Sequence, residues 1–165
     1  MDRLWSPWRY NYVTSAESVP TDQDPCLFCR VALASDDERN LLVLRAERNF
    51  IVLNRYPYST GHLMIAPYAH VATLEEADTH TLEEMMRLAQ RSEAALRVVY
   101  RPGGMNFGFN IGNCAGAGIA GHIHMHGLPR WAGDTSFITT IGETRVLPED
   151  LETTYRKVSA ALRGL

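Results

Sequence analysis

The sequence predicts an α+β domain in which a long helix and a C-terminal helix pack on an antiparallel sheet of about five strands. Short apolar runs separated by brief polar turns indicate antiparallel strands, because a parallel connection needs a dozen or more residues. One long segment has helical periodicity, and a weaker one ends the chain. With 165 residues, 45% of them hydrophobic, the chain has enough sequence for one domain with a real core.

Three strands are expected first, over residues 41–44, 50–53 and 62–66. The polar residues 47–49 separate the first two runs, which is typical of a hairpin. A turn rich in Pro, Ser and Gly at residues 57–61 precedes the third run. The three strands therefore form a continuous antiparallel unit.

The longest helix is expected to begin at Thr81, since Thr81-Leu82-Glu83-Glu84 has the capping-box pattern. Its helical spacing ends before Pro102-Gly103-Gly104. Two more strands are expected, about 105–111 and about 122–128, on either side of a loop rich in Gly and Ala. A second helix is expected between Pro148 and Leu162.

The chain shows no repeat or linker, so a single domain over residues 1–165 is expected. We divide it into an irregular aromatic arm (1–25), a core (26–145) and a C-terminal helix (146–165). The arm contains aromatic side chains with too much apolar surface to remain in water: Trp5, Trp8, Tyr10 and Tyr12. We expect them to pack on the domain or on a partner subunit.

Composition excludes several classes of partner. The net charge is −3 and no Lys/Arg cluster is present, which argues against a nucleic-acid surface. No apolar run approaches the roughly 18 residues of a membrane span, and the first eight residues lack the apolar segment of a signal peptide. Three cysteines are too few for a disulfide framework, so a reducing compartment, the cytoplasm, is expected.

The densest chemical signal is the segment 121–131, which contains three alternating histidines: His122, His124 and His126. In a strand, alternate side chains share a face, so the three imidazoles are expected together, with Ile123 and Met125 opposite. One interpretation of this face is a metal site, since imidazole is the commonest metal ligand. Another is a nucleophilic imidazole oriented by its neighbours. An exposed stripe without function is the third, and the apolar residues between the histidines disfavour it.

The loop before the histidines, residues 110–118, is rich in small residues. Such residues let the backbone approach a ligand, and successive N–H groups can bind an anion. A tight strand connection would have the same composition. Beside a histidine face, the loop favours a phosphate ligand over a bare metal.

The segment His122-Ile123-His124-Met125-His126-Gly127-Leu128 resembles the histidine triad family, whose hallmark is His-φ-His-φ-His-φ-φ with φ apolar; only Gly127 departs from it. Leu53-Asn54-Arg55 with Gly61-His62 is similar to the family's nucleoside-binding strand pair. Trp5-Ser6-Pro7-Trp8-Arg9 and Pro129-Arg130-Trp131 look like a bacterial branch that includes diadenosine tetraphosphate phosphorylases. The resemblance covers roughly residues 4–145 and implies a HIT-like fold.

The resemblance implies roles for the catalytic histidines. His124 would attack the α-phosphorus of an adenosine nucleotide and form a covalent nucleotidyl-histidine, which water or phosphate then cleaves. His126 would donate to the phosphate oxygens as charge builds on them.

The resemblance also implies the substrate contacts. Asn54 matches the position that meets the ribose hydroxyls, and His62 lines the same cleft. Asn110 and the Gly118 backbone are expected to contact the phosphates. Many members carry Ser or Gln at the position of Gly118, so the choice between water and phosphate as acceptor stays open.

Cys26-Leu27-Phe28-Cys29 is a Cys-x-x-Cys pair, which alone allows a metal site, a redox pair or coincidence. No thioredoxin-like βαβ context surrounds it. In some bacterial histidine triad proteins such a pair is completed by a His after the third strand and by the first triad His. The matching residues are His70 and His122, so the resemblance implies a structural zinc held by these four side chains.

The expected function is a nucleotide hydrolase or transferase that cleaves the α-phosphate linkage of adenosine nucleotides, in particular dinucleoside polyphosphates such as diadenosine tetraphosphate. A nucleoside phosphoramidase, a nucleotide-binding regulatory protein and a three-histidine metal hydrolase are the alternatives. A divalent cation such as Mg²⁺ would enter with the nucleotide. Family members are usually homodimers, and a homodimer is expected here.

Overall fold

The computed structural model describes residues 26–142 and 146–165. The elements in chain order are α2 (Leu27–Leu33), β1 (Leu42–Arg45), β2 (Asn49–Leu53), β3 (Leu63–Pro67), α3 (Thr79–Tyr100), β4 (Gly104–Phe109), the 3₁₀ turn η1 (Asn113–Ala115), β5 (Met125–Arg130), α4 (Phe137–Thr140) and α5 (Leu151–Arg163). The predicted order of three strands, a long helix, two strands and a helix is confirmed.

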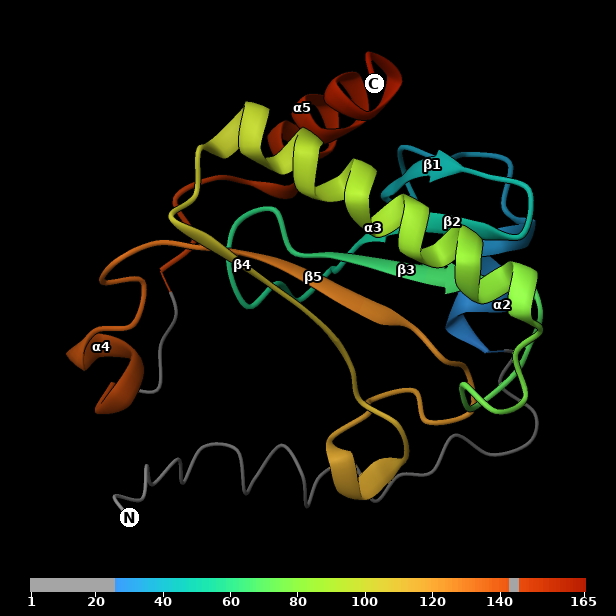
Figure 1. Cartoon of the computed structure of the whole chain (residues 1–165). Helices are drawn as coiled ribbons and strands as arrows, with labels where there is room; N and C mark the ends of the chain where they lie inside the picture. The colour runs from blue at the N-terminus through green and yellow to red at the C-terminus, as the bar shows by residue number, and fades with distance from the viewer. Residues whose placement is uncertain (1–25, 143–145) are drawn as a thin grey trace.

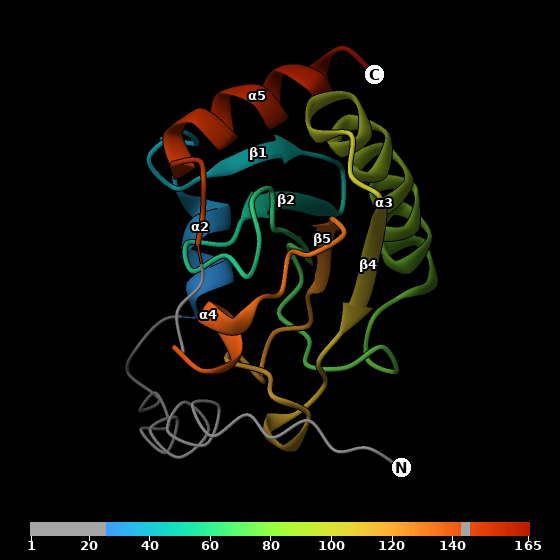
Figure 2. The same ribbon diagram turned by 90° about the vertical axis from the view of Figure 1, so that its left-hand side faces the viewer.

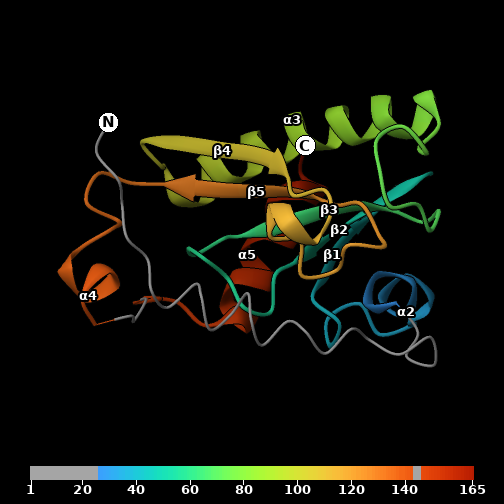
Figure 3. The same cartoon turned by 90° about the horizontal axis from the view of Figure 1, so that it is seen from below.

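The five strands form one sheet in the order β1-β2-β3-β5-β4, and every neighbouring pair is antiparallel. Helices α3 and α5 lie on one face of this sheet, whereas η1 lies toward the other face (Figures 1 and 3). The predicted α+β class is therefore confirmed. The core lies between the helices and the central strands, with β2 and β3 buried along their whole length.

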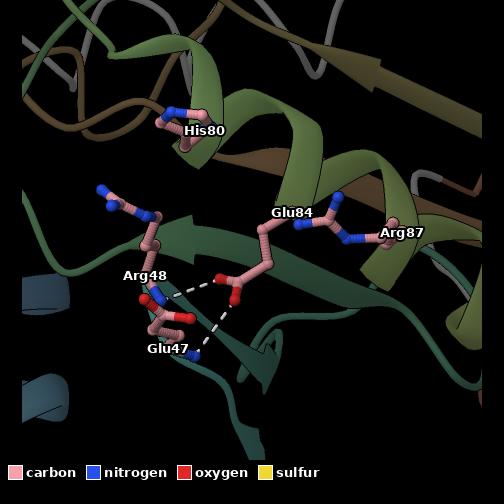
Figure 4. A pocket seen from close by; sticks show the side chains of 5 residues that line it. All are labelled: Glu47, Arg48, His80, Glu84 and Arg87. Atoms are coloured by element: carbon pink, nitrogen blue, oxygen red, sulfur yellow. Dashed lines mark hydrogen bonds between the residues drawn. The ribbon is translucent and has the colours of Figure 1, made fainter.

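The turn between β1 and β2 is tied to α3 by one carboxylate. Glu84 accepts hydrogen bonds from the backbone N–H groups of Glu47 (3.1 Å) and Arg48 (2.9 Å), as Figure 4 shows. Asn49 was expected in the turn but begins β2, fully buried, and its side chain donates to Glu84 (2.8 Å) and to the Thr81 carbonyl (3.0 Å). These bonds satisfy the amide nitrogen of a buried polar residue.

The first turn of α3 corrects the expected start at Thr81. The N-cap is Asp78, whose carboxylate accepts the backbone N–H of Thr81 at 3.1 Å. A short acidic side chain at this position satisfies an amide that has no partner within the helix. Asp150 caps α5 in the same way through Thr153 (2.7 Å), so α5 begins after Pro148 rather than at it.

Strand β5 begins at Met125, three residues after the expected start at His122. Pairing with β3 ends where Met125 lies opposite Ile65. Before that point the N–H of Ile123 donates to the carbonyl of Val71, in the loop after β3, at 2.7 Å. The segment before β5 therefore pairs with this loop and not with the sheet. His122 and His124 therefore precede the strand, and only His126 lies within it.

Gly127 is the residue that departs from the histidine triad pattern, and its surroundings explain the departure. It lies buried on β5 between β3 and β4, opposite Leu63 and Phe107. A Cβ atom there would lie 2.8 Å from Phe107 Cε1 and 2.9 Å from Leu63 Cδ1, closer than packed carbon atoms approach. A larger apolar residue does not fit between these two side chains.

The short helix α2 was not expected from the sequence. It begins directly after Cys26 and carries Cys29 and the buried Phe28, and it lies on the side of the sheet away from α3 (Figures 2 and 3). The predicted aromatic arm, residues 1–25, lies outside the described residues, and the division of the chain into arm, core and C-terminal helix stays a prediction. No helix in the described part is both long and apolar enough to cross a bilayer.

Candidate active site and metal site

His124 is buried just before β5, with 4% of its surface exposed. Its Nδ1–H donates to the backbone carbonyl of His122 at 2.8 Å. Because that nitrogen carries the hydrogen, Nε2 keeps a lone pair. Burial lowers the pKa of His124, so the ring is neutral at physiological pH. A neutral imidazole with a lone pair on Nε2 has the form required of a nucleophile.

His126 is on β5 and its ring lies beside that of His124, with centroids 4.9 Å apart. It receives a hydrogen bond from a further histidine, His62. The backbone N–H of Tyr58 donates to His62 Nδ1 at 3.1 Å, so the hydrogen of His62 is on Nε2. This Nε2 lies 2.9 Å from His126 Nδ1. His126 therefore accepts on Nδ1 and carries its own hydrogen on Nε2, where it can donate to an oxyanion.

The pKa of His126 is lowered to about 4, first by burial and then by the neighbouring His124. His126 is thus uncharged at physiological pH. A polyphosphate brought close to it would meet hydrogen-bond donors rather than a full positive charge.

Two of the expected substrate residues lie together. The side-chain oxygen of Asn54 accepts the backbone N–H of Tyr56 (2.9 Å), and its amide nitrogen lies 3.3 Å from His62 Nδ1. Asn54 therefore shapes the turn after β2 and holds it against His62. Asn110 directly follows β4 and Gly118 is exposed in the loop beyond η1. Their contacts with a phosphate stay predictions.

Tyr58 was not singled out from the sequence, yet it lies at this site. Its ring stacks on His126, with centroids 6.1 Å apart and planes 23° from parallel, and lies 4.7 Å from His62. It is 41% exposed, so it forms a wall that faces solvent. An aromatic residue in the turn before Gly61-His62 was the only available signal, and turns often contain one.

The predicted metal ligands lie together. The ligand atoms of Cys26, Cys29, His70 and His122 all lie within 4.8 Å of one another. Nδ1 of His122 lies 3.3 Å from Cys26 Sγ and 3.6 Å from Cys29 Sγ, and Nδ1 of His70 lies 3.3 Å from Cys29 Sγ. With Zn–S of about 2.3 Å and Zn–N of about 2.0 Å, a tetrahedral site has S–N edges of about 3.5 Å.

The chemistry of this donor set also fits zinc. Nε2 of His122 donates to the carbonyl of Pro67 at 2.9 Å, which leaves the lone pair on Nδ1 facing the two sulfurs. Orientation of a ligating imidazole by a carbonyl is usual for metal-bound histidine. The cluster contains two thiols and two imidazoles, a combination found in closed structural zinc sites.

The profile of the HIT domain family, the histidine triad family, matches residues 36–133. The chain belongs to this family. It is 40% identical over 163 residues to a Mycobacterium tuberculosis (strain ATCC 25618 / H37Rv) protein named AP-4-A phosphorylase, covering 94% of this chain and 82% of that protein. The prediction that the chain is a HIT-family enzyme is confirmed by this relationship.

Solved structures agree with the fold. A Zn-bound histidine triad family protein from Mycobacterium smegmatis matches with a TM-score of 0.69 at 29% identity, covering 85% of this chain and 94% of that one. A protein described as a hypothetical histidine triad nucleotide-binding protein, from Sulfolobus tokodaii strain7, matches with a TM-score of 0.68 at 26% identity, covering 85% of this chain and 93% of that one. The predicted HIT-like fold is therefore confirmed.

Proposed function

We propose that this HIT-family enzyme is a nucleotidyl transferase that cleaves dinucleoside polyphosphates such as diadenosine tetraphosphate, with inorganic phosphate as the acceptor. The observation that carries the proposal is the arrangement of hydrogens on the two adjacent histidines. His124 keeps a lone pair on Nε2, and His126 keeps a hydrogen on Nε2. The pair thus offers a nucleophile and a donor to the same substrate group.

In the first step, Nε2 of His124 attacks the α-phosphorus of the bound nucleotide. A P–N bond forms as the P–O bond to the rest of the polyphosphate breaks, and the released nucleotide leaves as an anion. The hydrogen stays on His124 Nδ1 and is donated to the His122 carbonyl, which holds the ring in place as it becomes positively charged. His126 donates from Nε2 to the phosphate oxygens as their charge increases.

In the second step, an oxygen of inorganic phosphate attacks the adenylyl-histidine. A new P–O bond forms, the P–N bond breaks and the electron pair returns to Nε2 of His124. Diadenosine tetraphosphate and phosphate therefore give ATP and ADP. Water in place of phosphate would give ATP and AMP.

Support for phosphate over water comes from the relative named AP-4-A phosphorylase, which is 40% identical across 94% of this chain. Gly118, exposed and without a side chain in the loop that precedes the histidines in sequence, is compatible with a second small anion.

Zinc bound by Cys26, Cys29, His70 and His122 would supply a cross-link between α2 and the segment before β5. The chemistry of transfer is assigned to His124 and His126, and zinc takes no part in either bond change. In this respect the proposal differs from a three-histidine metal hydrolase, in which all three triad imidazoles would bind one ion. His122 Nδ1 faces the two cysteines, whereas the other two histidines have hydrogen-bond partners of their own.

The test is incubation of the purified chain with diadenosine tetraphosphate, with and without inorganic phosphate and with and without Mg²⁺, followed by separation of the nucleotides. The proposal expects ADP and ATP only when phosphate is present. AMP and ATP without phosphate would make the enzyme a hydrolase. Absence of turnover, with tight AMP binding, would favour the nucleotide-binding regulatory protein, and cleavage of an adenosine phosphoramidate alone would favour the phosphoramidase.

The matched pair of variants is His124→Gly and His80→Ala. His80 lies in the first turn of α3 with a side chain that is 75% exposed, remote in sequence from the site. The His124 variant is expected to lose turnover while still binding AMP. The His80 variant is expected to keep both.

The homodimer stays part of this proposal. Strand β4 is at the edge of the sheet, and only one of its sides is paired within the described residues. An edge of this kind can accept a second chain. Light scattering of the full chain at several concentrations tests the assembly directly.

A further inference from the structure

Phe28 stands between the two cysteines of the metal site, and its ring covers the proposed nucleophile. The side chain is 1% exposed, and its ring centroid lies 4.7 Å from that of His124 and 5.2 Å from that of His122. Cys26 and Cys29 flank it in sequence and direct their sulfurs to His122 and His70. The same turn of chain thus carries two metal ligands and one wall of the nucleophile.

His122 makes a second connection between the metal site and His124. The Nδ1 atom of His122 faces the sulfurs and its Nε2–H donates to the Pro67 carbonyl. The backbone carbonyl of His122 accepts the hydrogen of His124 Nδ1. Any rotation of the His122 peptide would change the acceptor that fixes the nucleophile's tautomer. The metal site and the nucleophile are therefore joined at two points, by a ring contact and by a hydrogen bond.

Helix α2 needs this anchorage. It has seven residues, and its N-cap Cys26 makes no side-chain capping hydrogen bond. A helix this short is unstable without tertiary contacts. Its two buried side chains, Phe28 and Val31, belong to the hydrophobic core and hold the helix to the domain.

We propose that the metal site is a positioning device for the nucleophile: zinc bound to Cys26 and Cys29 holds Phe28 against His124 and fixes the His122 carbonyl that orients His124. Phe28 is a positioning residue, since it acts on the reaction through His124. The inference rests on the proposed role of His124 as nucleophile. The effect of metal on the order of the His124 ring can be measured in an experiment that does not depend on enzymatic turnover.

The first experiment compares Phe28→Leu with Phe50→Leu. Phe50 is equally buried and contacts Phe28 at 6.4 Å between ring centroids, but it makes no ring contact with His124. Both variants lose similar core volume. We expect Phe28→Leu to lower kcat by about tenfold or more with KM nearly unchanged and zinc content retained, because misplacing a reacting group affects kcat. Phe50→Leu should lose stability with a much smaller change in kcat.

Phe28→Met serves as the second variant in case Phe28→Leu does not fold. Met fills most of the volume but lacks the flat ring face, so kcat should again fall. Equal kcat losses in the Phe28 and Phe50 variants would overturn the positioning role, because both effects would then follow from weakened packing.

The second experiment follows the His124 ring by ¹⁵N NMR on the full chain, labelled in histidine, while zinc is removed by chelation and added back as zinc sulfate. We expect one tautomer, with hydrogen on Nδ1, in the zinc-loaded protein and averaged ring signals in the stripped protein. An unchanged His124 tautomer in folded, zinc-free protein would overturn the inference. Absence of turnover in the wild type would refute the proposed function alone, since the NMR result stands independently.

Discussion

The Nε2 atom of His62 lies 2.9 Å from Nδ1 of His126, and this contact sets which nitrogen of His126 carries its hydrogen. The backbone N–H of Tyr58 fixes His62 from behind at 3.1 Å. A backbone amide in the turn before β3 thus determines, through two imidazoles, that a donor faces the substrate. His62 was expected to line the nucleoside cleft. In the structure it also donates a hydrogen bond to His126.

Replacement of His62 by Ala is expected to lower kcat by about 10²-fold, a typical contribution of a positioned proton donor or acceptor. Without His62, Nδ1 of His126 has lost its donor and the ring can adopt the other tautomer. Steady-state kinetics with diadenosine tetraphosphate measures the effect, and His80→Ala is the control. A change of less than about threefold would show that His126 keeps its tautomer by other means.

The pKa of about 4 for His126 predicts an acid limb well below the value for an exposed histidine. The decline in kcat/KM that comes from His126 should appear as the pH approaches 4, because protonation of His126 places two hydrogens opposite each other at the His62 contact. An inflection near 6.5 in the pH–rate profile would contradict the buried, neutral state of this ring.

The stability of the folded protein should also depend on the protonation of His126. The pKa of His126 is lower in the folded protein than in the unfolded chain, so between pH 6.5 and about 4 the unfolded chain binds a proton that the folded protein excludes. The contribution of His126 to the free energy of unfolding is therefore fully present above pH 6.5 and decreases as the pH falls toward 4. Urea unfolding at pH 7 and pH 5 measures the decrease, which should be smaller in His126→Gln.

Removal of zinc is expected to lower Tm. A ligand present at 100 times its Kd stabilises the folded state by about 2.7 kcal/mol, which corresponds to about 5–10 °C in a domain of this size. Cys29→Ser should show the same loss together with reduced zinc content by elemental analysis. Cys114→Ser is the matched control, since Cys114 is exposed in η1. Equal Tm values with and without chelator would exclude a stabilising metal.

Gly127→Ala is expected to destabilise the protein by about 1–3 kcal/mol, the usual cost of overpacking. The added methyl group would meet Phe107 at 2.8 Å and Leu63 at 2.9 Å. Gly104→Ala is the control, because a Cβ at Gly104 has nothing within 4 Å. Gly104 is in β4 and Gly127 is in β5, so the change in strand propensity is the same in both variants. A difference in stability between them therefore measures steric crowding. Equal unfolding midpoints in the two variants would contradict the packing explanation.

The sequence predicted the order of elements because each long element carries its own periodicity. Strands β1 to β3 and helix α3 were located to within two residues, and the errors have local causes. Asp78, not Thr81, caps α3 because its carboxylate accepts the backbone N–H of Thr81, and Glu84, which a capping box would use, binds the β1–β2 turn instead. Helix α2 has too few residues to show a period.

The start of β5 could not be predicted because it depends on a neighbour. Pairing with β3 stops at Ile65, two residues before β3 ends at Pro67, and the loop after β3 then binds Ile123. The grouping of Cys26, Cys29, His70 and His122 came from a family resemblance, not from spacing, since three separate segments bring it about. The tautomers of His62 and His126 depend on backbone groups that no sequence pattern specifies.

The four metal ligands have a consequence for biosynthesis. Cys26 and His122 are separated by 96 positions, so the first thiol leaves the ribosome long before the last imidazole exists. A growing chain can therefore hold metal only loosely until the triad segment has been made, and the complete site forms late, together with the long-range contacts of β5. Measuring the zinc bound by nascent chains of increasing length would show the chain length at which the four-ligand site first forms.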